Sequence, residues 1–160
     1  MAVDMFLKLD DVKGESRDDK HKDEVDVLAW SWGMSQSGTT HMGGGGGAGK
    51  VSVNDLSLTK YVDKSSPTLM LATCGGKHFK EALLTVRKAG EKPLEYIKIT
   101  MKEVLVSSIS TGGSGGEDRL TENITLNFAE FKIAYTPQKP DGSGDAAVEA
   151  AYHIAKNVKI

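Results

Sequence analysis

The segment Val25-Asp-Val-Leu-Ala-Trp-Ser-Trp32 alternates large and small side chains. Successive side chains of a β-strand point to opposite faces, so this alternation predicts a strand over residues 25–35. Its phase places Leu28, Trp30 and Trp32 on one face, and large aromatic side chains favour that face for the core. The opposite face is then expected to meet solvent, a partner or a cavity; it holds Val25, Val27, Ala29 and Ser31.

Alternation of the same kind recurs on both sides of this segment. It predicts further strands over residues 3–9, 51–58, 82–86, 94–101, 104–109 and 122–135. The apolar phase slips by one residue at 54–55 and again near 129–130, and both slips are interpreted as β-bulges. Because bulges let a sheet curl or close, this pattern favours an antiparallel barrel or sandwich.

One short helix interrupts the predicted strands. Ser65, Ser66 and Pro67 suit its start, because serine caps a first turn and proline fits the first helical positions. Gly75 and Gly76 suit its end. The tail, residues 146–160, fits either a helix or a closing strand. The sequence therefore predicts one domain over residues 1–160, mainly β, an antiparallel β-barrel with one short flanking α-helix.

The composition excludes several classes of partner. With 20 basic and 22 acidic residues the net charge is −2, so no strong field would recruit nucleic acid or anionic lipid. No stretch approaches the roughly 18 apolar residues of a membrane span, so no membrane insertion is expected. Cys74 is the single cysteine, which rules out an intramolecular disulfide. Residues 1–15 lack an apolar run of secretory length, so export would not use a cleaved signal.

The glycine-rich segment 43–50 partly matches a phosphate-binding loop. Gly44, Gly49 and Lys50 stand at the required spacing, but Val51 replaces the serine or threonine that the loop needs. A phosphate loop must also lead into a helix, whereas a strand is predicted here. We therefore expect no nucleotide site. The segment is interpreted either as a mobile loop or as an arm that becomes ordered against a partner.

No pattern of residues predicts catalysis. The histidines are scattered without the spacing of metal ligands, and a Gly-x-Ser-x-Gly nucleophile elbow is missing. The carboxylates lie mostly in charged loops, where a solvated surface is the simpler interpretation. The chain is therefore expected not to be an enzyme and to use no metal or other cofactor.

Several long segments carry a resemblance to a known family. They are Met1-Ala-Val-Asp-Met-Phe6, Asp11-Val-Lys-Gly-Glu-Ser16, Asp26-Val-Leu-Ala-Trp-Ser-Trp-Gly-Met-Ser-Gln-Ser37, His41-Met42 with the glycine run to Val51, Lys102-Glu-Val-Leu-Val-Ser-Ser108 and Ser110-Thr-Gly-Gly-Ser-Gly-Gly-Glu-Asp-Arg-Leu-Thr-Glu-Asn123. Together these segments span residues 1 to about 129. They resemble the haemolysin-coregulated protein family, the tube subunit of bacterial type VI secretion systems.

The resemblance implies a compact β-barrel with a flanking helix, assembled as a homo-hexameric ring. Rings would stack into a tube that a contractile sheath drives outward beneath a spike trimer, and effector proteins would bind in the ring lumen. The protein would then reside in the bacterial cytoplasm before firing and be secreted afterwards without a cleaved signal peptide.

The resemblance also implies two candidate surfaces. The ring-stacking arm corresponds to residues 37–55, with the candidate residues Ser37, His41, Met42, Gly43, Gly44, Gly45, Gly46, Gly47 and Lys50. The lumen of this family is lined in part by small residues, so Ser31 is the candidate for the lumen and cargo. A monomeric β-barrel ligand-binding module is the alternative, and the residues alone would favour it. Native mass spectrometry separates the two, because a hexamer favours the tube and a monomer the module.

Overall fold

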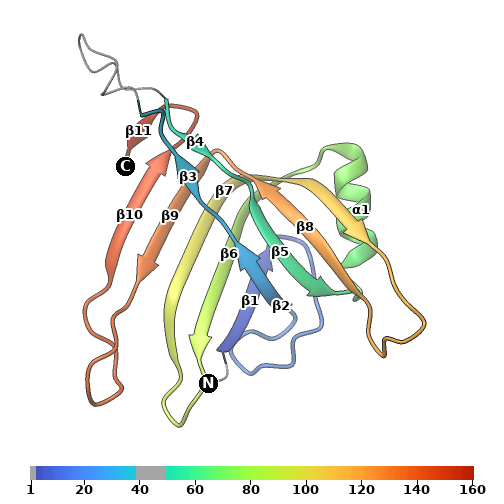
Figure 1. The fold of residues 1–160 in the computed structure, drawn as a ribbon, viewed down its shortest axis with the longest axis horizontal. Helices are drawn as coiled ribbons and strands as arrows, with labels where there is room; N and C mark the ends of the chain where they lie inside the picture. The colour runs from blue at the N-terminus through green and yellow to red at the C-terminus, as the bar shows by residue number, and fades with distance from the viewer. Residues whose placement is uncertain (1–2, 39–49) are drawn as a thin grey trace.

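The structure, a computed structural model, describes residues 3–38 and 50–160. Six antiparallel strands close into a barrel in the order β1-β2-β5-β8-β7-β6 (Figure 1). They are β1 (Val3–Leu9), β2 (Val25–Ser31), β5 (Leu56–Tyr61), β6 (His78–Lys88), β7 (Leu94–Thr111) and β8 (Thr121–Asn127). The predicted antiparallel barrel is therefore confirmed, and β1 has the predicted bounds.

Strand β7 belongs both to the barrel and to a sheet that extends beyond it. Residues 97–102 of β7 pair with β9 (Glu130–Tyr135), whereas residues 105–111 pair with β8. The sheet continues from β9 to β10 (Val148–His153) and β11 (Val158–Lys159). The tail, which the sequence left open between helix and strand, thus contains two strands. Glu103 lies between the two halves of β7 with φ of 54°, in the left-handed region.

A two-stranded ribbon projects from the barrel (Figure 1). It consists of β3 (Met34–Ser35) and β4 (Ser52–Val53), which pair antiparallel. At its base Trp32 Nε1 donates to the Asn54 carbonyl oxygen at 2.9 Å, and Asn54 N–H donates to the Gly33 carbonyl oxygen at 2.9 Å. The phase slip at residues 54–55 is therefore a break between ribbon and barrel, and the predicted bulge is wrong. The slip near 129–130 is likewise a break, between β8 and β9.

The interior of the barrel is filled with aliphatic side chains from all six strands. The largest of those that are almost fully buried are Leu7, Leu56, Leu58, Leu84, Ile99, Met101, Ile124 and Leu126. They follow the period-two alternation of their strands, which is the burial pattern that a curved sheet with one dry face produces. Phe128 and Phe131 extend this core beneath the ribbon, where Trp32 packs edge-on to Phe131 with ring centroids 4.9 Å apart.

The predicted division of faces in β2 is wrong in its first half. Val25 and Val27 are buried, at 1% and 6% exposure, whereas Leu28 is 38% exposed. The register with β5 shifts between Val27 and Ala29, so a β-bulge reverses the phase at this point. Beyond the bulge the prediction is correct, because Trp30 packs partly buried against the core and Ser31 is exposed.

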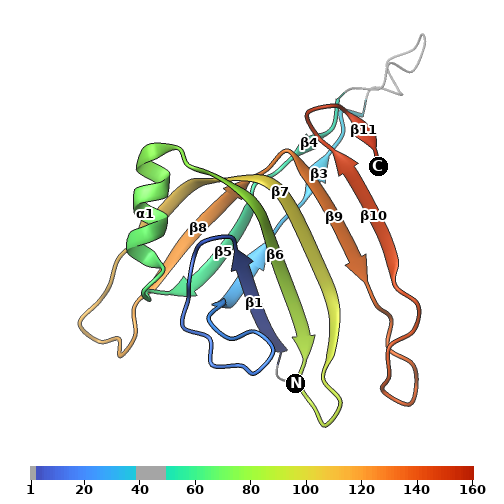
Figure 2. The same cartoon turned by 180° about the vertical axis from the view of Figure 1, so that it is seen from behind.

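The helix α1 (Ser66–Gly75) has the predicted start and end. Proline stands in the first turn, and Gly76 ends the helix with φ of 63°, which glycine adopts without strain. Leu69 and Ala72 are buried on the inner face, and the helix lies at one end of the barrel, against β7 (Figure 2). Ser65 occupies the N-cap position without a side-chain cap, since its hydroxyl donates to Asp63 instead.

Candidate assembly surfaces

The outer side of β2, β5, β8 and β7 carries two rows of small uncharged residues. The strand registers align Ser31, Ser57, Thr125 and Ser108 in one row across the four strands. The same registers align Ala29, Thr59, Asn123 and Ser110 in the neighbouring row. We call these two rows the hydroxyl face. Their side chains point away from the core because Leu58, Ile124 and Ile109 occupy the inward phase of the same strands.

Side chains of the hydroxyl face hydrogen-bond one another. The Thr59 hydroxyl donates to Asn123 Oδ1 at 2.7 Å. Thr125 Oγ1 lies 2.6 Å from the Ser108 hydroxyl and 2.6 Å from that of Ser107. Ser107 in turn donates to Asp55 at 2.6 Å, and Asp55 also accepts from Asn127, so one carboxylate ends the network at the edge of the face. Much of the hydrogen-bonding capacity of this face is therefore satisfied internally.

Ser31 lies on the hydroxyl face, beside a shallow depression of about 260 Å³ between β2, β5 and β8. The sequence analysis singled out this residue alone. The other members could have been found from the same alternation, since Leu56 and Leu58 fix the inward phase of β5 and so turn Ser57 and Thr59 outward. What the sequence did not supply was the register that aligns them with Ser31.

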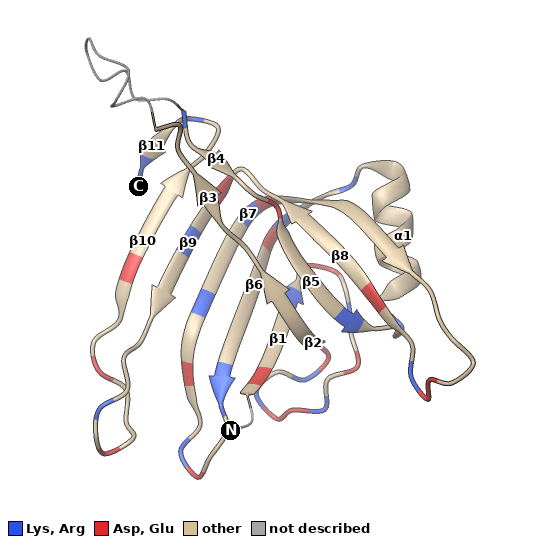
Figure 3. Cartoon of the chain, in the orientation of Figure 1, with Lys and Arg blue, Asp and Glu red and all other residues tan. Residues whose placement is uncertain are grey.

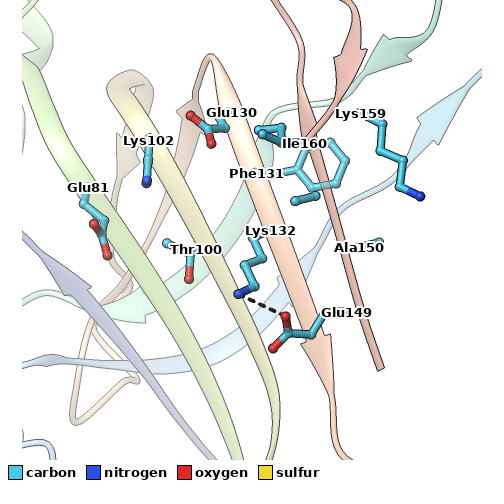
Figure 4. Close-up of a pocket in the computed structure, with 11 residues that line it drawn as sticks. Glu81, Thr100, Lys102, Glu130, Phe131, Lys132, Glu149, Ala150, Lys159 and Ile160 are labelled. Atoms are coloured by element: carbon cyan, nitrogen blue, oxygen red, sulfur yellow. Dashed lines mark ion pairs between the residues drawn. The ribbon is translucent and has the colours of Figure 1, made fainter. Parts of the chain in front are cut away.

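A second outer face is highly charged. On β6, β7 and β9 the registers place Glu81 beside Lys102 and Lys102 beside Glu130, so charge alternates across the sheet. These residues line a depression of about 630 Å³ together with Lys132 and Glu149, whose charged groups pair at 3.0 Å (Figure 4). Figure 3 shows charged residues spread along this part of the sheet. The two outer faces thus differ in chemistry, one hydroxyl-rich and one ionic.

An apolar groove of about 570 Å³ separates the ribbon from β9 and β10. Its lining includes Met34 and Val53 from the ribbon and Ile133 and Tyr152 from the sheet. Met34 is 48% exposed, so the base of the ribbon presents apolar surface. This surface lies next to the segment predicted to be the stacking arm.

The predicted arm falls only partly within the described residues. Ser37 and Lys50 are described and both are exposed. The other candidates lie outside the described residues; they are His41, Met42, Gly43, Gly44, Gly45, Gly46 and Gly47. The ribbon positions the two ends of this segment beside each other, because β3 leads into it and β4 follows it.

A buried ionic cluster lies under the start of α1, and the sequence analysis missed it. Lys60 and Glu122 are both 0% exposed, are paired across β5 and β8, and hydrogen-bond through Lys60 Nζ and Glu122 Oε1. Lys60 Nζ also lies 3.2 Å from Asp63 Oδ1, and the Ser66 hydroxyl donates to Glu122. The signal was available, since Lys60 continues the inward phase of Leu56 and Leu58. The cluster fixes the helix to the barrel from inside.

Within residues 3–38 and 50–160, no three histidine, cysteine or carboxylate side chains gather as a metal site would need. In the same part of the chain, no helix is long and apolar enough to cross a bilayer. The pairing pattern, the filled interior and the extended outer faces define the class as a small antiparallel β-barrel protein with a projecting ribbon.

Comparison with known proteins identifies the family. The model described as "Type VI secretion system effector, Hcp" matches residues 6–135, and the chain belongs to this family. It is 66% identical to Protein hcp1 of Pseudomonas aeruginosa strain PAO1 over 161 residues, which cover 99% of each protein. The resemblance to haemolysin-coregulated proteins seen in the sequence is confirmed.

Solved structures of the family share the fold. The crystal structure of Hcp1 from Salmonella typhimurium is 40% identical, with a TM-score of 0.83 over the full length of both chains. A type VI secretion system effector from Yersinia pestis is 35% identical, with a TM-score of 0.78 over 94% of this chain and 100% of that one. The chain is therefore a protein of the type VI secretion system with the Hcp barrel fold.

Proposed function

We propose that this chain is the structural subunit of a type VI secretion tube. Its copies assemble as hexameric rings, the rings stack into a tube, and the secreted tube carries effectors in its lumen. The observation that carries this proposal is the hydroxyl face, which spans four strands of a chain that belongs to the Hcp family. We assign this face to the inner wall of the ring.

The chemistry of the hydroxyl face suits a wall along which other proteins must pass. Its short side chains hydrogen-bond one another, so a passing protein has few unsatisfied groups to bind. No charged residue stands in either row, which removes the strongest pairwise attractions to a charged cargo. Effectors would then be held weakly and released readily, with Ser31 among the residues that contact them.

For the arm we propose contact between successive rings, through Ser37, His41, Met42, Gly43 to Gly47 and Lys50. The ribbon supports this role because it projects from the barrel and presents both ends of the segment away from the core (Figure 1). Glycine lets backbones approach closely, which suits docking onto the surface of a neighbouring ring.

The remaining partners and the location follow from the same proposal. The tube would contact the contractile sheath around it and the spike trimer at its tip. The subunit would be made in the bacterial cytoplasm and leave the cell when the machine fires, without a cleaved signal peptide. Its role would be structural, without catalysis, cofactor, nucleic acid or membrane insertion.

Native mass spectrometry of the purified chain tests the ring directly. The proposal expects a hexamer as the principal species and ring-shaped particles by electron microscopy. A monomer at micromolar concentration would overturn the proposal and favour the alternative, a monomeric ligand-binding barrel. Against that alternative, almost fully buried side chains such as Leu58, Leu84 and Ile99 occupy the barrel interior where a ligand would bind.

Substitution of Ser31 by glutamine tests the assignment of the lumen. The side chain is exposed, so Ser31→Gln should leave folding and ring formation unchanged while altering the amount of effector that co-purifies with the ring. Ser114→Gln, in the exposed loop between β7 and β8, is the matched control. Unchanged retention of every effector tested in the Ser31 variant would contradict a position on the inner wall.

A further inference from the structure

The loop between β1 and β2, residues 10–24, packs on the outer side of the barrel and forms a small second core there (Figure 2). Phe6 is only 4% exposed although it lies on the face of β1 opposite to Leu7, because the loop covers it. Backbone hydrogen bonds close the loop, with Gly14 N–H donating to the Asp23 carbonyl oxygen at 2.8 Å. A Cβ at Gly14 would lie 2.4 Å from the Glu24 carbonyl oxygen, so this close approach requires glycine.

His21 is the centre of this second core. His21 is 8% exposed, and its ring stacks on that of Phe6 with the ring centroids 4.4 Å apart and an interplanar angle of 10°. Nδ1 lies 2.9 Å from Glu24 Oε2, within the loop. Nε2 lies 2.6 Å from Glu95 Oε1, on β7, which is 74 residues away in sequence. One imidazole thus links the loop to the barrel.

The two contacts of His21 cannot both be good hydrogen bonds when the ring is neutral. A neutral imidazole donates from one nitrogen and accepts at the other, whereas an ionised carboxylate only accepts. One of the two contacts would then bring two acceptors together at hydrogen-bonding distance. The imidazolium form donates from both nitrogens and satisfies Glu24 and Glu95 at once.

Further charged groups surround this contact on every element that packs against it. They are Asp18 and Glu24 from the loop, Glu95 and Lys98 from β7, Arg87 from β6 and Asp4 from β1. Arg87 is engaged by Asp18 at 2.8 Å and Asp4 at 3.1 Å. Among the ion pairs of the described residues, Glu95 has one cationic partner besides His21: Lys98, whose Nζ lies 3.1 Å from Glu95 Oε2. Glu24 has no second cation among the same ion pairs, so a neutral ring would keep its one proton on Nδ1, toward Glu24, and lose the bond to Glu95.

The pKa of Glu95 agrees with a charged partner. Burial acts to raise this pKa, but hydrogen bonds from His21 and Lys98 outweigh burial and hold it below its ordinary value. A carboxylate with a lowered pKa stabilises the fold above its ordinary pKa, about 4.3, and loses that contribution as the pH falls further. The ion pair between a carboxylate and an imidazolium has the opposite pH dependence. It is lost as the pH rises and the histidine gives up its proton.

We propose that His21 is a proton-dependent clamp that fixes the 10–24 loop to the barrel. In the imidazolium form it bridges Glu24 and Glu95 and holds the loop over Phe6. When it loses its proton, the bond to one carboxylate fails and the loop is released from β7. The clamp is closed while the ring is an imidazolium and opens when the ring loses that proton. This inference does not depend on the proposed tube function.

Nuclear magnetic resonance of the imidazole nitrogens tests the clamp in the intact protein. The nitrogen chemical shifts report whether the ring is imidazolium or neutral, and spectra are compared at about pH 5.5 and about pH 8.5, on either side of the ordinary histidine pKa of about 6.5. Over the same interval the loop amides, Gly14 and Ser16 among them, should exchange on the order of tenfold faster after correction for the intrinsic effect of pH, as loss of a charge-assisted bond implies. A neutral ring at pH 5.5, an imidazolium that persists at pH 8.5, or unchanged loop exchange would each overturn the proposal.

Two variants separate the clamp from general loss of stability. His21→Gln should lower the melting temperature more at pH 5.5 than at pH 8.5, because only the acidic form contains the full clamp. Glu95→Gln supplies a side chain that can accept from the imidazolium and can donate to the bare nitrogen of the neutral ring, so the pH dependence of loop exchange should be lost. The control is His78→Gln, at an exposed position of β6. An effect of His21→Gln that is equal at both pH values would contradict the clamp.

Discussion

Removing the charge of Lys60 should destabilise the barrel more than most single substitutions. In the variant Lys60→Met, Glu122 would stay buried without its cation, keeping only the hydroxyl of Ser66. Removing one partner of a buried ion pair costs about 3–5 kcal/mol, because the other charge is left uncompensated. Oε2 of Glu122 already has no hydrogen-bond partner, so little remains to offset the loss. In a chain of this length the melting temperature should fall by roughly 6–20 °C.

Urea denaturation followed by tryptophan fluorescence, at one fixed protein concentration, measures this cost. The double variant Lys60→Met with Glu122→Leu should recover most of the loss, because a buried pair replaced by apolar side chains is often neutral or stabilising. Lys132→Met is the matched control, since its pair with Glu149 is about half exposed on both sides. It should change stability by less than about 1 kcal/mol.

Two outcomes would refute this reasoning. One is a stability of Lys60→Met within about 1 kcal/mol of the unmodified chain, which would mean that the cluster is solvated in solution. The other is a double variant as unstable as the sum of its two single variants. Additive costs would show that Lys60 and Glu122 do not depend on each other.

Three further predictions concern the core, the glycine segment and nucleotide binding. Trp30→Ala should destabilise the fold by no more than the roughly 3–5 kcal/mol of a buried aromatic truncation, because its ring is only partly buried; unchanged thermal stability would show that it contributes no packing. If the proposed tube forms, shortening Gly43 to Gly47 should leave the isolated hexamer intact while blocking tube growth and secretion. Dissociation into monomers would assign the segment to the contact within a ring, and normal secretion would show that it is dispensable. Calorimetry with ATP should show no binding at micromolar concentration, since Val51 replaces the required hydroxyl residue; a signal abolished by Lys50→Ala would reverse this expectation.

The sequence predicted those parts of the fold that depend on local signals. The helix was found from its serine, proline and glycine residues, each of which favours one end of a helix for a local steric reason. The faces of the first half of β2 were predicted wrongly because a bulge at Leu28 has no local signature, and its position depends on pairing with β5. The tail was ambiguous because its alanines favour a helix while Tyr152, Ile154 and Val158 favour a strand, and only pairing with β9 makes β10 a strand.

The candidate surfaces show the same limit. Ser31 was predicted to lie outside the core, and it does, but its neighbours on the hydroxyl face come from strands far away in sequence. Lys60 and Glu122 were overlooked because charged residues are normally assigned to the surface. Their positions in the inward phase of β5 and β8 contradicted that assumption, and this contradiction was the available signal.

The shared strand β7 has a mechanical consequence for a protein of the type VI secretion system. Along residues 97–102 it is hydrogen-bonded to β6 on one edge and to β9 on the other, and along 105–111 it holds β8. A pull applied along β7 would load the bonds of each ladder in parallel, so many must yield together before the strand can slide. A pull across the strand at the end of β10 would load bonds one after another and open the outer sheet first. The protein should therefore resist tension along β7, and it should yield first at its C-terminal strands β10 and β11, which lie outside the barrel.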